Sequence, residues 1–333
     1  MPAETSHDCA VISALQLTAG LILLLVGGRF LVRSGVTLAE GMGVSPLMIG
    51  LTVVAIGTSS PELLVNLMAA FKGVPSLGVG NVIGANIANV LLVLGAAGLV
   101  FPIARNSAIL RRDGPVMLVA VLAFAAAALD GELTRWQGLL MIACWGAYLF
   151  AVYRIERRSA AAMAARKAET RELHERRQPV WLTAAILAGS IGALIGGSHL
   201  LVEGAVTVAR GLGVSEAVIG ATIVAFGTVM PELVASITAA LHRHTDLALG
   251  NVIGSIVVNV LGILGLAAAI FPFPIPPEVL QFDLWVMLAV CALLVALGLR
   301  SNGIGRRIAG AMVVGYVAYD VALYAGVPAL LRF

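Results

Sequence analysis

Residues 57–62 read Gly-Thr-Ser-Ser-Pro-Glu, and residues 227–232 read Gly-Thr-Val-Met-Pro-Glu. Both stretches lie inside long apolar segments, where a charged side chain is costly and therefore marks a functional site. The shared glutamates, Glu62 and Glu232, each follow a proline, which removes a hydrogen bond from a helix. The two stretches therefore predict a pair of interrupted helices with a carboxylate at each interruption.

The two stretches belong to a longer internal repeat. Residues 43–95 align with residues 213–265 without an insertion, and about half of the aligned positions are identical. The same offset pairs Phe101-Pro102 with Phe271-Pro272, beyond the end of that alignment. A match of this length indicates a duplicated unit, so we expect the two glutamates to occupy equivalent places.

The composition is that of a membrane protein. The chain has 333 residues, of which 60% are hydrophobic and 12% charged, and its mean hydropathy is +1.00. These values exclude an ordinary soluble domain and predict several membrane-spanning helices. Ten apolar segments lie at about residues 11–32, 46–71, 77–101, 115–130, 136–153, 181–202, 216–241, 247–271, 282–299 and 306–327.

Each half holds five of these segments, so the second half enters the membrane from the opposite side and the repeats are inverted. The predicted fold is an all-α membrane protein with ten transmembrane helices in two inverted five-helix repeats, with broken helices at the midplane. The first repeat is expected at residues 1–153 and the second at residues 181–333. Between them, residues 154–180 form a charged linker.

The basic residues predict an orientation. Seventeen of the 21 Lys and Arg residues fall on one side of the ten predicted spans, together with residues 154–180. Because cytoplasmic loops carry the excess of basic residues, the linker is expected in the cytoplasm and both termini outside. The strong preference for Arg over Lys is typical of a GC-rich bacterial genome. We therefore expect a multi-pass protein of the bacterial inner (plasma) membrane.

The repeated motif offers oxygen ligands at one point. Thr58 and Glu62 are four residues apart and share a helix face, as do Thr228 and Glu232. Each proline also frees a backbone carbonyl one turn earlier, which must find a partner inside the membrane. Two carboxylates surrounded by hydroxyl and carbonyl oxygens are suitable ligands for Ca²⁺.

A polar stripe follows each motif. Its members are Asn81, Ala85 and Asn89 in the first copy, and Asn251, Ser255 and Asn259 in the second. We expect Asn89 and Asn259 to coordinate the cation. For Asn81 and Asn251, near the start of their helices, capping or hydrogen bonding between helices is expected instead.

At these residues the chain resembles the calcium/cation antiporter superfamily, and within it the prokaryotic sodium/calcium exchangers. The repeats of that family carry Gly-Thr-Ser-x-Pro-Glu followed by Gly-Asn-x-x-Gly-Ser-Asn. The corresponding stretches here are GTSSPEL with GNVIGANIAN, and GTVMPEL with GNVIGSIVVN. The resemblance implies that Glu62 and Glu232 bind Ca²⁺ and, in alternation, Na⁺. It implies further ligands from Thr58, Thr228, Asn89 and Asn259.

The resemblance also implies two flanking sodium sites. One uses the Ala55 carbonyl, Thr58 and Ser59, and the other uses the Ala225 carbonyl, Thr228 and Ser255. The chain departs from the family at three positions. Val229 and Ala85 stand where the family often has serine, and Asn259 stands where some members have aspartate. Each flanking site thus loses a hydroxyl, so the sequence supports Ca²⁺ binding better than any sodium stoichiometry.

The leading hypothesis is an antiporter that exchanges Ca²⁺ for Na⁺ by alternating access. A proton-coupled Ca²⁺ or divalent cation exchanger remains an alternative, because buried glutamates can carry protons when the metal leaves. A passive divalent cation channel fits inverted repeats less well. An intramembrane hydrolase would need a HExxH or GxSxG signature, and neither is present.

We therefore expect no enzymatic activity, no cofactor and no nucleic-acid partner. The expected partners are the lipid bilayer and the transported ions, Ca²⁺ with Na⁺ or H⁺, and no oligomer is implied. One further acidic residue, Asp320, lies in the last predicted span close to Tyr316, Tyr319 and Tyr324. It has no acidic counterpart in the first repeat, so a hydrogen-bonded structural role is favoured over a proton relay.

Overall fold

The computed structural model describes residues 3–42, 44–73, 75–103, 108–168, 179–212, 225–275, 277, 279–299 and 303–324. Nearly all of these residues are helical. Short π-helical segments, labelled η, interrupt several of the longer helices. A π-helix adds a residue to one turn and often occurs at a functional site.

The first half of the chain forms one long helix, a bent pair and further helices of the bundle. Its elements are α1 (Ala3–Met42), α2 (Pro46–Ile49), η1 (Gly50–Val54), α3 (Ala55–Thr58), α4 (Ser60–Phe71), α5 (Pro75–Ala88), η2 (Asn89–Leu94), α6 (Gly95–Val100), α7 (Ala108–Ala128), β1 (Glu132–Leu133) and α8 (Arg135–Ala168). The helix α8 passes through residue 153, where the sequence predicts the end of the first repeat. The middle of the predicted linker, residues 169–178, lies outside the described residues.

The second half follows the same plan. Its described elements are α9 (Val180–Gly211), α11 (Ala225–Leu241), α12 (Thr245–Val257), η4 (Val258–Leu264), α13 (Gly265–Ile270), β2 (Phe273–Pro274), η5 (Val279–Asp283), α14 (Leu284–Leu299) and α15 (Arg306–Tyr324). The π-helices η2 and η4 begin at Asn89 and one residue before Asn259, so this irregularity occurs in both repeats.

The chain is a membrane protein with fewer clear spans than the sequence predicts. Within the described residues, six helices are long and apolar enough to cross a membrane, or seven if the bent pair from Pro46 to Phe71 is one span. The helix α11 is described only from Ala225 onward and counts as a shorter apolar helix. The helices α7 and α15, which carry arginines near their starts, are not among the six.

Two helices, one from each repeat, form the centre of the bundle. In the spans Leu77–Val100 and Thr245–Ile270, 78% and 83% of the most apolar window is buried. In α1 and α9 the corresponding share is 28%. Their exposed faces carry Leu15, Leu25 and Val208, as expected for helices that face lipid. The site is therefore to be sought around the two central spans.

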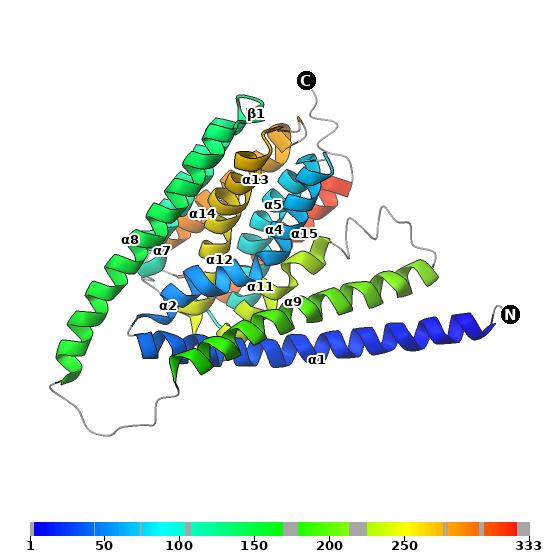
Figure 1. The fold of residues 1–333 in the computed structure, drawn as a ribbon, viewed down its shortest axis with the longest axis horizontal. Helices are drawn as coiled ribbons and strands as arrows, with labels where there is room; N and C mark the ends of the chain where they lie inside the picture. Colours follow the sequence, from blue (N-terminus) through cyan, green and yellow to red (C-terminus); the bar gives the residue numbers. More distant parts are fainter. Residues whose placement is uncertain are drawn as a thin grey trace.

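The long helices α1 and α9 lie side by side along one edge of the central helices (Figure 1). Small residues make this contact possible. A Cβ atom added at Gly20 would lie 2.7 Å from the carbonyl oxygen of Gly197, and one at Gly27 would lie 3.1 Å from that of Ser190. The two backbones are thus in direct contact, as is common where small residues line a membrane helix interface.

The first predicted helix break is confirmed. The helix α3 ends at Thr58, α4 begins at Ser60, and the two flanking segments are bent by 44°. Ser59 between them has φ −80° and ψ 10°, outside the ideal helical range. The bend brings Glu62 into the first turn of α4.

The second predicted break is wrong for the described residues. The helix α11 runs without interruption from Ala225 to Leu241 and contains Pro231. The carbonyl of Gly227, which loses its usual donor because Pro231 has no N–H, accepts a hydrogen bond from the Ser198 hydroxyl of α9. A side chain from a neighbouring helix therefore satisfies the freed carbonyl, and the helix assignment continues through Pro231.

Contacts between loops group the helix ends into two sets. At one end of the bundle, β1 pairs antiparallel with β2, and the rings of Phe71 and Phe271 are 4.8 Å apart. At the other end, Ile103 forms a β-bridge with Ile304. This grouping agrees with spans that alternate in direction along the chain.

Candidate functional site

The structure brings the two predicted glutamates together in the interior. Glu62 and Glu232 are each 1% exposed. The Ser59 hydroxyl, from the bend in the first repeat, donates a 3.1 Å hydrogen bond to Oε1 of Glu232 in the second. The Glu62 carboxylate lies close enough to Glu232 to interact with it electrostatically. Two acidic groups far apart in the sequence thus share one buried site.

The two carboxylates have different neighbours. Glu232 has the Ser59 hydroxyl as a donor, and the Thr58 hydroxyl also lies beside it. The residue equivalent to Ser59 in the second repeat is Val229, which is buried at 4% exposure and has no hydroxyl. The repeat is therefore symmetric in its glutamates but not in the hydroxyls around them.

Asn251 connects three helices around this site. Its Oδ1 accepts a 3.2 Å hydrogen bond from the Thr58 hydroxyl, and its Nδ2 donates to Ser236 Oγ at 3.1 Å. The expectation of a hydrogen-bonding role between helices is thus confirmed for Asn251. For its counterpart Asn81, Oδ1 has no hydrogen-bond partner among the described residues.

Several buried oxygens of the predicted ligands have no hydrogen-bond partner among the described residues. Within the described chain, six buried side-chain oxygens lack a hydrogen-bond partner. They are Glu62 Oε2, Glu232 Oε2, Asn81 Oδ1, Asn89 Oδ1, Asn259 Oδ1 and Ser255 Oγ. Five of the six belong to residues that the sequence predicts as ligands. Because buried polar atoms are normally paired, a group of unpaired oxygens fits a bound cation, which accepts oxygen ligands from several side chains.

The sequence predicts Ala55, Ala225 and Thr228 as further ligands. The Ala55 carbonyl already accepts hydrogen bonds from the Ser59 N–H at 3.0 Å and from the Thr58 hydroxyl at 3.4 Å. Ala225 is the first described residue of α11. Thr228 follows in the same helix, half-buried, three residues from Ala225. The structure thus describes the surroundings of the two acids more fully than those of the residues predicted for the flanking sodium sites.

Asn259 has a partner that the repeat does not reveal. Its Nδ2 donates a 3.0 Å hydrogen bond to Oδ1 of Asn86, and Asn86 Nδ2 lies 3.5 Å from the sulfur of Met287. Asn86 has no polar counterpart, because Ile256 occupies the equivalent position in the second copy. The predicted polar stripe, in which the members are four residues apart, does not include Asn86. This residue nevertheless lies within the motif GNVIGANIAN, residues 80–89.

One further prediction concerns an acid outside the site, Asp320. The Tyr316 hydroxyl bonds to Asp320, in agreement with the structural role predicted for this acid. Tyr319 instead donates a 2.9 Å hydrogen bond to Asp283 on the neighbouring helix. In the first repeat, Tyr148 likewise donates to Asp113 at 3.4 Å. Asp113 and Asp283 occupy equivalent positions of the repeat in the sequence, but their tyrosine hydrogen-bond partners are known only from the structure.

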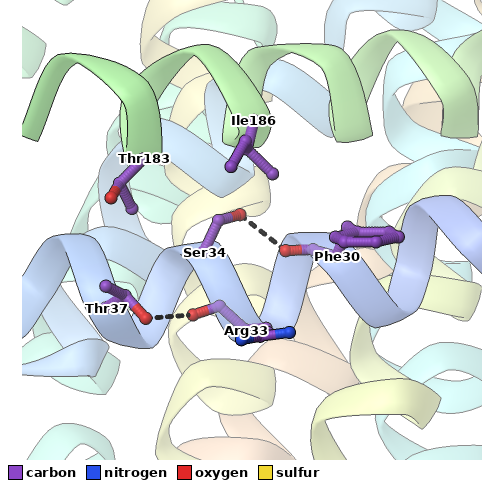
Figure 2. A pocket seen from close by; sticks show the side chains of 6 residues that line it. All are labelled: Phe30, Arg33, Ser34, Thr37, Thr183 and Ile186. Atoms are coloured by element: carbon purple, nitrogen blue, oxygen red, sulfur yellow. Dashed lines mark hydrogen bonds between the residues drawn. The ribbon is translucent and has the colours of Figure 1, made fainter. Parts of the chain in front are cut away.

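A cavity of about 110 Å³ lies apart from the glutamates, between α1 and α9. Figure 2 shows its lining, which consists of Phe30, Arg33, Ser34, Thr37, Thr183 and Ile186. The hydroxyls of Ser34 and Thr37 donate to carbonyls of their own helix. The cavity therefore belongs to the seam between the two long helices.

Comparison with known proteins identifies the family. The family described as sodium/calcium exchanger protein matches residues 12–154 and 182–325, which together cover most of the chain. The chain belongs to the sodium/calcium exchanger family. Each of the two matched ranges contains one copy of the internal repeat.

Individual proteins are similar to this chain over almost its whole length. The sodium/calcium exchanger MaX1 of Methanosarcina acetivorans is 32% identical, with 94% of this chain and 99% of the relative covered. The inner membrane protein YrbG of Escherichia coli is 33% identical, with 92% and 95% covered. Solved structures of the sodium-calcium exchanger NCX_Mj, one of them soaked with Na⁺ and Sr²⁺, superpose with a TM-score of 0.80. In that comparison the identity is 28%, and 95% of this chain and 98% of the other are covered.

Proposed function

We propose that this exchanger moves Ca²⁺ across the membrane in exchange for Na⁺, by alternating access around Glu62 and Glu232. The observation that carries the proposal is the shared burial of the two carboxylates, each with one oxygen that has no hydrogen-bond partner among the described residues. Two negative charges in a low-dielectric site need a compensating charge, and a divalent cation supplies it. The membership of the sodium/calcium exchanger family supports the same cargo.

The proposed ligand set joins both repeats. Oxygens from Glu62, Glu232, Asn89 and Asn259 would hold Ca²⁺, and the hydroxyls of Thr58 and Thr228 would complete the set. In the flanking sodium sites we place Ala55, Ser59, Ala225 and Ser255. The proposed fold is ten spans in two inverted repeats, with the linker in the cytoplasm and both termini outside. The two groups of loop contacts support such alternation.

Coupling to H⁺ is the second candidate. It is favoured by Val229 and Ala85, both 4% exposed, which place no hydroxyl where the flanking sodium sites would use one. Na⁺ must replace its hydration shell with protein oxygens, so each missing hydroxyl weakens its site. A proton needs no such shell.

Transport by the purified protein in proteoliposomes tests both candidates. Radioactive Ca²⁺ uptake would be measured under an imposed Na⁺ gradient and, separately, under a pH gradient without Na⁺. Uptake driven by the Na⁺ gradient is the expected result, and uptake driven by the pH gradient alone would favour the second candidate. Ca²⁺ flux that persists without either gradient and without a counter-ion would contradict antiport and indicate a channel.

A further inference from the structure

We propose that Met287 and Asn86 set the direction of the Asn259 side chain, so that its carbonyl oxygen faces the cation. The three residues form a chain of contacts from α14 through α5 to η4, and all three are completely buried. The proposal rests on the proposed function, because it treats Asn259 as a ligand of the transported ion. It adds two positioning residues that contribute no ligand themselves.

The chain of contacts begins at the Met287 sulfur. A thioether has no proton, so it can only accept a hydrogen bond. Asn86 Nδ2 lies 3.5 Å from this sulfur, whereas the opposite orientation would bring two acceptors together in the interior. Met287 therefore favours the orientation in which the Asn86 amide nitrogen points toward α14 and its Oδ1 points toward Asn259.

The orientation of Asn86 then determines that of Asn259. Because Asn86 offers an oxygen, Asn259 must offer its amide nitrogen, and this hydrogen bond is 3.0 Å long. The Asn259 Oδ1 is left on the other side of the amide, buried and without a partner among the described residues. The segment η4 that carries it packs against α4, the helix of Glu62. A reversed amide would instead present N–H groups to the cation, which would repel it.

Such a device matters for an amide ligand but not for a carboxylate. A carboxylate at position 259 would have two equivalent oxygens, so its orientation would not matter. An amide has one oxygen and one nitrogen, and its value as a ligand depends on which end faces the ion. The position equivalent to Asn86 in the second repeat is Ile256, so the duplication does not supply a second amide of this kind.

The inference can be tested with a double-mutant cycle on Ca²⁺ affinity. The dissociation constant would be measured by calorimetry on the purified full-length protein, and Ca²⁺ exchange would be measured in proteoliposomes. We expect Asn86→Leu to raise the dissociation constant about tenfold, because the buried Asn259 nitrogen loses its acceptor and the amide can turn over. The maximal exchange rate should change little. Met287→Leu, which keeps the volume but removes the acceptor, should produce a smaller loss of the same kind.

The same substitution in an Asn259→Asp background separates orientation from packing. In that background, Asn86→Leu should raise the Ca²⁺ dissociation constant by less than about twofold, because either oxygen of a carboxylate can face the cation. Such coupling between two substitutions is expected for residues in contact. An equal loss in both backgrounds would mean that Asn86 acts by packing, and unchanged affinity in Asn86→Leu and Met287→Leu would also overturn the inference. As a matched control, Ile256→Val should leave the affinity unchanged.

The outcomes for the two proposals are distinguishable. If the native protein exchanges Ca²⁺ and Asn86→Leu shows no dependence on residue 259, the inference fails and the proposed function stands. If the native protein neither binds nor exchanges Ca²⁺, both fail.

Discussion

Glu62 and Glu232 share one motif but not one environment. Ser59 donates a hydrogen bond to Glu232, whereas Val229, the residue equivalent to Ser59 in the second repeat, has no hydroxyl to donate. A hydrogen-bond donor stabilises a buried carboxylate, and a valine does not. The two acids are therefore expected to contribute unequally to ion selectivity, although both charges are needed for a divalent ion.

The first prediction concerns both charges. Glu62→Gln and Glu232→Gln should each reduce Ca²⁺ transport to background, because one remaining carboxylate leaves Ca²⁺ half compensated in a site that water cannot solvate. The measurement is Ca²⁺ flux in proteoliposomes, with protein insertion checked by membrane extraction. Glu203→Gln, which changes an exposed acid on α9, is the matched control and should transport normally. Near-normal flux in either buried variant would rule out the two-glutamate site.

The second prediction concerns the missing hydroxyls. Val229→Ser combined with Ala85→Ser should lower the Na⁺ concentration needed for half-maximal Ca²⁺ efflux, because each hydroxyl adds an oxygen to a proposed sodium site. Ca²⁺ affinity should persist, since both glutamates are retained. The measurement is a Na⁺ titration at fixed pH. Val229→Ala, which shortens the side chain without adding an oxygen, should not have this effect. Strong, cooperative Na⁺ dependence in the native protein would mean that other oxygens already fill these places.

At the scale of elements, the equivalent prolines Pro61 and Pro231 lie in different helix geometries. After Thr58 the chain bends by 44° around Pro61, whereas α11 passes through Pro231 without interruption. In the second repeat, Ser198 of α9 donates to the carbonyl that Pro231 frees. In the first repeat the position equivalent to Ser198 is Gly28, which has no side chain to donate.

The third prediction tests this support of α11. Ser198→Ala should lower the free energy of unfolding by about 1–3 kcal/mol, because the buried Gly227 carbonyl is left without a donor. The measurement is the thermal midpoint of the protein in detergent. Ser190→Ala on the same helix is the control. Its hydroxyl donates to the carbonyl of Ile186 within α9, so its removal should change stability by less than about 0.5 kcal/mol. Equal effects in the two variants would show that the bond to Gly227 has no special role.

At the scale of the whole molecule, the two repeats meet across the central spans. The loops divide into two groups, with β1 and β2 at one end and the bridge from Ile103 to Ile304 at the other. Such a division is expected if successive spans run in opposite directions. Combined with the excess of basic residues on one side, it predicts the orientation in the membrane.

The fourth prediction tests that orientation. Single cysteines at Ser159 and Ser6, introduced after replacement of Cys9, Cys144 and Cys291, should react with membrane-impermeant reagents from opposite faces. Ser159 should be labelled only when the cytoplasmic face is accessible, and Ser6 only from outside. Labelling of both from the same face would contradict an odd number of spans in the first half, and the inverted repeat with it.

Several features of this protein follow from the sequence by itself. The apolar composition predicts a membrane protein. The paired motifs indicate Glu62 and Glu232 as candidate functional residues before any fold is known, because an acidic side chain in a membrane segment is energetically costly. The repeat also points to Asn89 and Asn259, since both copies keep the residue. Local rules sufficed here: the hydropathy of a segment, the missing N–H of a proline and the spacing of residues on a helix face.

Only the tertiary structure decided which contacts each copy of the repeat makes. The sequence could not reveal that Ser198 bonds to the Gly227 carbonyl, that Asn251 bonds to Thr58, or that Asn86 lies between Met287 and Asn259. Each of these contacts joins residues that lie on different helices, and a hydrogen bond forms only when packing brings a donor and an acceptor within about 3 Å. A repeat in sequence fixes which residues are equivalent, whereas the neighbours of each copy depend on how the helices pack.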